Sequence, residues 1–209
     1  ITSLSTLLQG IAPVPSVFDV TIHGLKTDSR DVRSGDAFVA LAGARTPADH
    51  YIEQAIGAGA TVILLESAQP DECYEHEGVL IVPVTMLRAH LGKLADRFFE
   101  HPSQRLRLIG VTGTNGKTSV SHYIATLLQE TGTPCGVIGT LGYGMPGALQ
   151  EGTHTTPDVV QVNRVLSKII AQGGRAAAME VSSHALEQGR VDNPVSYTHL
   201  RAHETVLDL

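Results

Sequence analysis

The stretch "GVTGTNGKTSV", residues Gly110–Val120, decides how the second half of the chain folds. A phosphate-binding loop commonly has the pattern G-x-x-x-x-G-K-[ST] between a strand and a helix. Gly116, Lys117 and Thr118 match the end of that pattern, but Val111 stands where its first glycine belongs. The sequence therefore predicts a nucleotide site of a variant family rather than of the general NTPase type.

The residues of this loop suit a chain of phosphates. Gly113 and Gly116 let the backbone approach a phosphate closely, and backbone N–H groups at a helix N-terminus attract anions. Lys117 can reach the β- and γ-phosphates, and Thr118 is placed to ligate Mg²⁺. The alternative is a plain glycine turn with an exposed lysine, and the order of strand, loop and helix argues against it.

Strand and helix patterns alternate on both sides of the loop. Short apolar runs predict strands at residues 36–41, 60–66, 78–84, 105–113, 134–142 and 175–183. Apolar spacing of three to four residues predicts helices at 49–60, 85–102, 119–132 and 156–174. The third helix is expected to end at Gly132, and the fourth to begin with Pro157 and Asp158. The second helix, which should stop before Pro102, is expected to link two domains and to carry Lys93 and Arg97 on a solvated face.

Composition limits the classes of function. The net charge of −6 and the absence of a basic run argue against a nucleic-acid surface. No apolar stretch approaches 18 residues, which argues against a membrane span. The two cysteines lie far apart without a CxxC pattern, as in proteins of a reducing compartment. We therefore expect a cytoplasmic protein that binds neither nucleic acid nor a membrane. The protein is also expected to be a monomer.

Four stretches together resemble the Mur ligases, the enzymes that build the peptide stem of peptidoglycan. "GVTGTNGKTS" is similar to their ATP loop, which folylpolyglutamate synthetases share. "TDSRDVRSGDAFVAL" (27–41), "THTTPD" (153–158) and "MEVSSHALEQGRV" (179–191) resemble the MurE type, which adds a diamino acid to UDP-MurNAc-L-Ala-D-Glu. The resemblance implies an α/β chain, with a small N-terminal UDP-binding domain before an incomplete P-loop-type ATP-binding domain with a parallel sheet.

The resemblance also implies domain bounds and residue roles. It places the UDP-sugar domain at 1–86, a linker helix at 87–102 and the partial ATP domain at 103–192. Mg²⁺ would be held by Thr118 and Glu180, and Lys117 would be catalytic. ATP would be held by Gly113, Thr114, Asn115, Gly116, Lys117, Thr118 and Ser119. The UDP-MurNAc-dipeptide would be bound by Thr27, Ser29, His154, Thr155, Thr156, Ser182, Gln188 and Arg190.

Several of these residues also have ordinary structural explanations, which stay open. Glu180 fits a strand-end salt bridge as well as a metal site, and Ser182 fits a helix N-cap. Gln188 fits a plain surface position, and Asp28 with Arg30 fits a structural turn pair. His184, four residues after Glu180, is expected to be a packed histidine rather than a metal ligand.

The resemblance implies ATP-dependent amide ligation through an acyl phosphate, with meso-diaminopimelate or lysine as the diamino acid. It ends at Asp192, where family members continue to a metal-binding histidine, a carbamylated lysine and a C-terminal domain. Residues 193–209 are expected to be a foreign tail without a strand for the sheet, and His199 with His203 is not expected to bind metal. We therefore expect a truncated ligase that is inactive alone, and a non-catalytic nucleotide-binding module or another ligase of the superfamily remain as alternatives.

Overall fold

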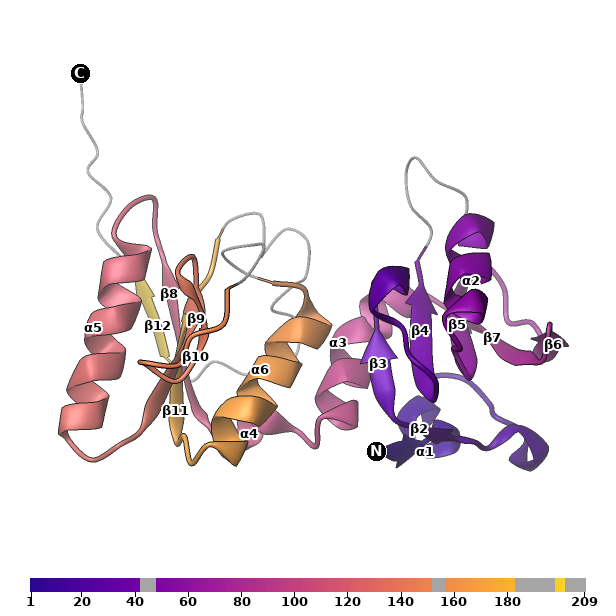
Figure 1. Cartoon of the computed structure of the whole chain (residues 1–209), viewed down its shortest axis with the longest axis horizontal. Helices are drawn as coiled ribbons and strands as arrows, with labels where there is room; N and C mark the ends of the chain where they lie inside the picture. Colours follow the sequence, from indigo (N-terminus) through magenta and orange to yellow (C-terminus); the bar gives the residue numbers. More distant parts are fainter. Residues whose placement is uncertain (42–47, 152–156, 183–197, 202–209) are drawn as a thin grey trace, which may run out of the picture. The chain divides into compact units, whose positions relative to one another are not determined.

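The computed structural model describes residues 1–41, 48–151, 157–182 and 198–201, and the chain divides into two compact units, Ile1–Phe98 and Phe99–Leu209. Each unit has a five-stranded sheet of its own (Figure 1). Both sheets are mostly parallel and carry helices, which confirms the predicted α/β class. Within the described ranges, no helix is long and apolar enough to cross a membrane.

The sheet of the first unit has the strand order β3-β4-β5-β7-β6. Its strands are β3 (Gly24–Lys26), β4 (Asp36–Ala40), β5 (Val62–Ser67), β6 (Tyr74–His76) and β7 (Val79–Thr85). The strands β3, β4, β5 and β7 run parallel, while β6 pairs antiparallel with β7. Every residue of β4 is buried, as expected for a parallel strand covered on both faces. The strands predicted at 36–41, 60–66 and 78–84 are thereby confirmed.

Helices cover this first sheet. They are α1 (Leu4–Leu8), α2 (Ala48–Gly57) and α3 (Leu87–Phe98), with 3-10 turns η1 (Ser16–Phe18) and η2 (Ser29–Asp31). The helix α2 packs on β4 and η2, and α3 contacts β5 and α1. Two short strands, β1 (Thr2–Ser3) and β2 (Thr21–Ile22), pair antiparallel.

Arg97 of α3 does not lie on a solvated face, contrary to the expectation from sequence. Its Nη1 atom donates hydrogen bonds to the carbonyl oxygens of Thr6 (3.3 Å), Leu7 (2.7 Å) and Gln9 (2.9 Å). The last carbonyl groups of a helix have no partner within it, and a guanidinium can satisfy several at once. Arg97 therefore caps the end of α1, whereas Lys93 is exposed as expected.

The sheet of the second unit has the order β10-β9-β11-β8-β12. Its strands are β8 (Arg107–Thr112), β9 (Cys135–Gly139), β10 (Gly142–Gly144), β11 (Ala176–Glu180) and β12 (Thr198–Arg201). All neighbours pair parallel except β10, which turns back antiparallel to β9. In this order β11, which ends at Glu180, lies between β9 and β8, the strand that leads into the glycine loop.

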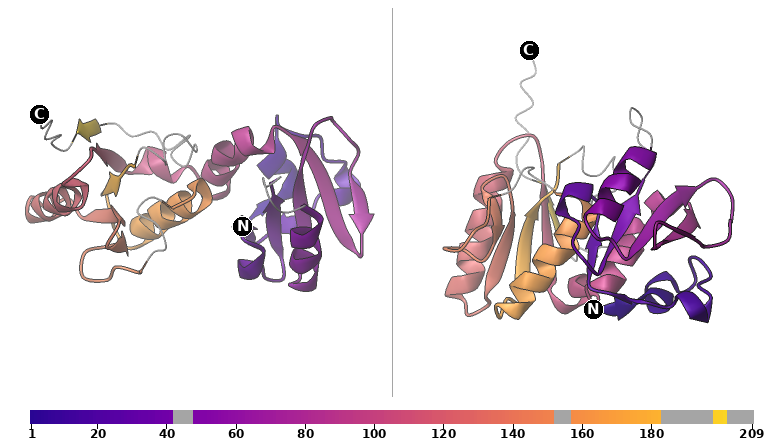
Figure 2. Two further views of the ribbon diagram at one scale, coloured as in Figure 1. Left: turned by 90° about the horizontal axis from the view of Figure 1, so that it is seen from above. Right: turned by 45° about the vertical axis from the view of Figure 1, so that its right-hand side comes forward.

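The two faces of β11 are covered by different helices. Ala176 and Ala178 pack in a cluster with Ala125 of α5 (Lys117–Glu130), while Ala177 and Met179 pack in another with α6 (Val159–Ala171). Figure 2 shows α5 and α6 on opposite sides of the sheet. Because side chains alternate along a strand, Glu180 shares the face of Ala176 and Ala178, and so points to the side of α5.

The chain between the units departs from the predicted single helix at 85–102. The helix α3 ends at Phe98, and Pro102 begins a separate short helix, α4 (Pro102–Arg105). Glu100 and His101 between them have positive φ angles of 61° and 54°, which interrupt a right-handed helix. Proline suits the first position of a helix because its missing N–H would have no partner there.

The expectation that residues 193–209 contribute no strand is wrong. Thr198–Arg201 form β12, which pairs parallel with β8 from Ile109 to Thr112. The segment therefore covers one edge of β8. A four-residue strand carries too little periodicity to be found in sequence, and its pairing depends on the open edge that β8 offers.

Candidate phosphate- and metal-binding site

The glycine loop joins β8 to α5 as predicted, but the helix begins at Lys117 rather than at Ser119. Gly113 and Gly116 have φ angles of 131° and 79°, in a region of backbone conformation that residues with a Cβ atom rarely adopt. Gly116 occupies the N-cap position and has no side chain with which to cap the helix. The first N–H groups of α5 are therefore left to an external anion, the arrangement that binds phosphate at helix N-termini.

Lys117 folds its side chain back over this loop. Its Nζ atom donates hydrogen bonds to the carbonyl oxygens of Gly113 (2.7 Å) and Thr114 (3.4 Å). These contacts hold the ammonium group of Lys117 beside the glycine loop, close to the N-terminus of α5. A phosphate arriving there would meet both the helix N–H groups and a positive charge.

Thr118 and Glu180 meet although 62 positions separate them in the sequence. The Oγ1 atom of Thr118 donates a 3.0 Å hydrogen bond to Oε2 of Glu180. Glu180 is only 1% exposed, at the carboxyl end of β11, where parallel sheets commonly place ligands. The structure thus brings together the two residues that the sequence analysis assigned to the metal.

A third residue, Thr140, which was not among the residues predicted from sequence, also contacts this carboxylate. Its backbone N–H donates to Oε1 of Glu180 (3.0 Å), and its hydroxyl donates to Oε2 (3.1 Å). Thr140 directly follows β9, the neighbour of β11 in the sheet. Local pattern carried no signal for this residue, because Thr140 falls inside the strand predicted at 134–142. The end of β9 at Gly139 places it at the edge where neighbouring parallel strands end.

Gly139 makes room for the carboxylate. A Cβ atom at this position would lie 2.0 Å from Oε1 and 2.6 Å from Cδ of Glu180, far inside van der Waals contact. Any larger residue would have to displace the Glu180 side chain. The last residue of β9 is therefore part of the site, through the volume that it leaves open.

The oxygen atoms of Thr118 and Glu180 fit a magnesium ion. Mg²⁺ prefers hard oxygen ligands in octahedral geometry, in which adjacent ligand oxygens lie about 2.9 Å apart. The distance of 3.0 Å between Thr118 Oγ1 and Glu180 Oε2 is close to that spacing. A buried carboxylate beside a phosphate-binding loop also supplies the negative charge that a divalent cation requires.

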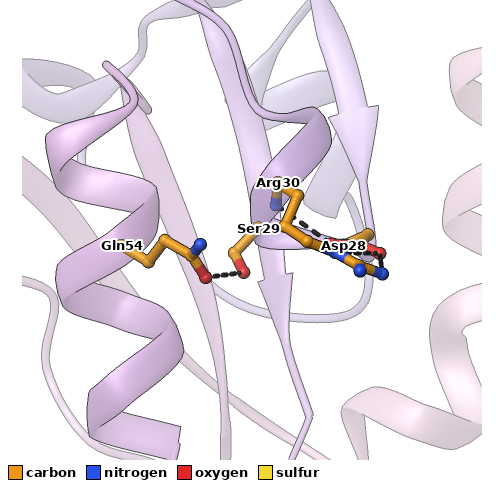
Figure 3. A network of polar contacts seen from close by, with 4 residues as sticks. All are labelled: Asp28, Ser29, Arg30 and Gln54. Carbon is orange, nitrogen blue, oxygen red and sulfur yellow. Dashed lines mark hydrogen bonds and ion pairs between the residues drawn. The ribbon is translucent and has the colours of Figure 1, made fainter.

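In the first unit, Ser29 is held by a polar contact with α2 (Figure 3). Ser29 is 4% exposed, and its hydroxyl donates a 2.6 Å hydrogen bond to Oε1 of Gln54. The oxygen of the hydroxyl can still accept a hydrogen bond from a ligand N–H, but its proton is engaged. Thr27, which like Ser29 is expected to bind the UDP-MurNAc-dipeptide, lies partly buried just after β3.

Asp28 and Arg30 form the structural turn pair that remained open as an alternative. The Asp28 carboxylate accepts from the backbone N–H of Arg30 (3.0 Å) and so caps η2. It also forms an ion pair with the guanidinium at 2.5 Å, drawn in Figure 3. The hydrogen bond from the Arg30 side chain lowers the pKa of Asp28 below its ordinary value, against the opposing effect of partial burial.

Seven of the remaining candidates lie outside the described residues. They are His154, Thr155, Thr156, His184, Gln188, Arg190 and His203. Ser182 is described and lies two residues after the end of β11, so it follows Glu180 at the same sheet edge. His199 belongs to β12 by its backbone, which pairs with Gly110.

Another group of possible metal ligands lies in the first unit. Glu53, His76 and Glu77 bring one ligand atom each within 4.8 Å of one another. All three residues are exposed, and the imidazole of His76 already contacts the Glu53 carboxylate at 3.1 Å. Water competes strongly at such a surface, and we assign this group no role in the candidate site.

Comparison with known families agrees with this geometry. The description "Mur ligase family, catalytic domain" matches residues 21–99, and "Mur ligase middle domain" matches residues 111–200, past Asp192. Together the two matches cover most of both units. The chain belongs to the Mur ligase family. The phosphate-binding loop, Glu180 and Thr140 all lie within the match to the middle domain.

Individual relatives in the Mur ligase family carry a more specific name. The chain is 47% identical over 195 residues to the UDP-N-acetylmuramoyl-L-alanyl-D-glutamate--2,6-diaminopimelate ligase of Alkalilimnicola ehrlichii, and 43% identical over 174 residues to that of Coxiella burnetii. These matches cover 90% and 83% of the chain, but only 39% and 35% of the relatives. A solved structure of a ligase with this name is 33% identical, with a TM-score of 0.65, over 83% of this chain and 34% of that one. The chain thus spans well under half the length of these relatives.

Proposed function

We propose that this chain forms the UDP-sugar- and ATP-binding part of a ligase that joins a diamino acid to UDP-MurNAc-L-Ala-D-Glu. The diamino acid is meso-diaminopimelate, or lysine. The relatives that match the chain are named for diaminopimelate, which supports the first of these. The free cysteines Cys73 and Cys135 are consistent with a reducing cytoplasm, the compartment that contains ATP and UDP-sugars.

One observation carries the proposal: the hydrogen bond between Thr118 and Glu180 places a hydroxyl and a buried carboxylate beside a phosphate-binding loop. This combination serves phosphoryl transfer from a nucleoside triphosphate. A nucleotide-binding module without chemistry would need the loop but not the carboxylate. The geometry therefore favours a ligase over such a module.

The proposed reaction has two steps. A carboxylate oxygen of the dipeptide attacks the γ-phosphorus of ATP, so that the bond to the β,γ-bridging oxygen breaks and ADP leaves. The amine of the diamino acid then attacks the acyl carbon, and inorganic phosphate leaves with the electron pair of the broken C–O bond. The nitrogen gives up one proton to the solvent, which leaves a neutral amide. Lys117 and the first N–H groups of α5 would bind the phosphates and stabilise the charge on the oxygen atoms in the first step.

Thr118 and Glu180 would hold Mg²⁺, which would neutralise negative charge on the phosphates when bound. The remaining residues are proposed to bind the substrate. Ser29 and Thr27 would hold the uracil end in the first unit. His154, Thr155, Thr156, Ser182, Gln188 and Arg190 would bind the muramoyl-dipeptide, with the Arg190 guanidinium suited to a carboxylate or phosphate.

The first test measures ATP binding to the 209-residue chain by isothermal titration calorimetry with Mg²⁺. Lys117→Ala should weaken ATP binding at least about 10-fold, since a charge-assisted hydrogen bond contributes about 1.5–3 kcal/mol to the binding free energy. Lys93→Ala, which removes an exposed lysine from α3, serves as the matched control and should bind like the original chain. Equal ATP affinity in all three proteins would refute the role of Lys117.

A second test separates the substrate classes. UDP-MurNAc-L-Ala-D-Glu and a folate are titrated separately into the chain. Binding of the UDP-sugar alone supports the proposal. Binding of the folate alone would assign the chain to a folylpolyglutamate synthetase instead.

A further inference from the structure

Thr140 holds Glu180 through two separate groups. The backbone N–H of Thr140 engages Oε1, and its hydroxyl engages Oε2, at 3.0 and 3.1 Å. One residue thus contacts both oxygens of the same carboxylate. Such a pair of contacts opposes rotation of the carboxylate plane, which a single hydrogen bond would permit.

The hydroxyls of Thr118 and Thr140 converge on the same oxygen. Oε2 of Glu180 accepts from Thr118 at 3.0 Å and from Thr140 at 3.1 Å. The two donors come from different elements, the first turn of α5 and the end of β9. Thr140 therefore ties the carboxylate to the sheet, while Thr118 ties it to the loop that would receive the phosphates.

Gly139 and Thr140 act together at this point. The missing side chain at Gly139 lets the carboxylate approach the backbone of β9, where a Cβ would lie 2.0 Å from Oε1. Only at that short range can the N–H of Thr140 reach the same oxygen. Thr140 is itself exposed, at the rim where a ligand of the loop would approach.

From these contacts we propose that Thr140 is a positioning residue for the divalent cation of the site, acting through Glu180. The proposal rests on the function proposed above, since it needs a cation at Thr118 and Glu180. Groups that hydrogen-bond a metal-ligating side chain orient it, and their loss commonly lowers metal affinity about 10- to 100-fold. Thr140 differs from a catalytic residue because it touches the carboxylate and not the reacting atoms.

The experiment uses Mn²⁺ as the probe, because its electron paramagnetic resonance signal falls on binding. Mn²⁺ is titrated into the 209-residue chain with and without ATP, and ATP binding is measured separately in EDTA. Thr140→Val removes the hydroxyl but keeps the backbone N–H and the shape of the side chain. This variant should bind Mn²⁺ about 10-fold more weakly, while its affinity for ATP in EDTA should stay unchanged.

Two further variants complete the comparison. Thr140→Ser restores the hydroxyl and should restore Mn²⁺ affinity. Thr126→Val removes a hydroxyl that donates to the His122 carbonyl oxygen within α5, away from Glu180, and should have no effect. A merely structural role for Thr140 would lower the melting temperature and ATP affinity in EDTA together.

The outcomes distinguish the two proposals. If the original chain binds Mn²⁺ and ATP and Thr140→Val binds them equally well, the role of Thr140 is wrong and the proposed site stands. If the original chain binds neither, the proposed function fails for this chain, and the inference about Thr140 fails with it.

Discussion

Thr118 and Glu180 share a 3.0 Å hydrogen bond that connects the first turn of α5 to the end of β11. The contact depends on the parallel register of the two central strands, in which Glu180 lies opposite Val111 of β8. The loop that follows β8 therefore turns back over the carboxylate. A hydroxyl, a carboxylate and the glycine loop thus meet at one edge of the sheet.

We expect Glu180→Gln to separate charge from shape at this site. The amide keeps the size of the carboxylate and can still hydrogen-bond with Thr118 and Thr140, so the fold should persist. It lacks the negative charge, so Mn²⁺ affinity should fall at least about 10-fold. Glu130→Gln, at the exposed end of α5, is the control for loss of a charge. Unchanged Mn²⁺ affinity in Glu180→Gln would exclude Glu180 as a ligand.

Gly139→Ala should damage the same site by crowding alone. The new methyl group would lie 2.0 Å from Oε1 of Glu180, so the side chain must move or β9 must shift. Overpacking of this kind costs about 1–3 kcal/mol, measured as the free energy of unfolding in urea, and cation binding should weaken with it. Gly57→Ala, at the end of α2, has no atom within 4 Å of the added methyl and should be neutral or slightly stabilising. Equal stability in both variants would contradict the close approach at Gly139.

The two cysteines should react with iodoacetamide at different rates. Cys135 is fully buried, and burial raises the pKa of its thiol to about 11, so about 0.1% is thiolate at pH 8. Burial also raises the pKa of Cys73, but this side chain is only partly covered. Mass spectrometry of the folded chain should show alkylation of Cys73 first, and of Cys135 only after unfolding. Rapid labelling of Cys135 in the folded chain would show that β9 is not covered as described.

The pKa of Asp28 should depend on Arg30. The Arg30 side chain donates a hydrogen bond that lowers the pKa of the carboxyl group, so the pair stabilises the fold at pH values above the ordinary aspartate pKa. This contribution is lost as the pH falls through the lowered pKa of the folded state. In an NMR titration, Arg30→Ala should raise the pKa of Asp28, whereas Arg33→Ala should leave it in place. A pKa unaffected by Arg30→Ala would mean that the ion pair does not persist in solution.

The sequence was sufficient for the main elements because each carries a strong local pattern. The apolar runs of β4, β5 and β7 and the spacing in α5 and α6 are visible without a structure. The entry of α6 was also visible, since the Asp158 carboxylate accepts from the N–H of Gln161 as an N-cap. The start of α5 was placed late because Lys117 and Thr118 were counted with the loop, although the backbone turns helical directly after Gly116.

Other features depend on contacts between distant segments. Thr140 lies in a glycine-containing turn with no periodicity, and its role becomes visible only when β9 and β11 are placed side by side. Arg97 fits the exposed face of a helix until α1 is placed against α3. The strand β12 depends in the same way on the edge of β8. Such features follow from topology, which local pattern does not specify.

The alanines of β11 have a consequence for the tolerance of the site to substitution. Ala176 and Ala178 lie on the face of β11 that α5 covers, so the middle strand carries little side-chain volume on that face. The thickness of the layer between this face and α5 helps to set how far the helix stands from Glu180. A larger residue at Ala176 or Ala178 would push α5, and Thr118 with it, away from the carboxylate, although the two proposed ligand residues themselves would be unchanged. The dimensions of the proposed cation site thus depend partly on buried residues that are not among its proposed ligands.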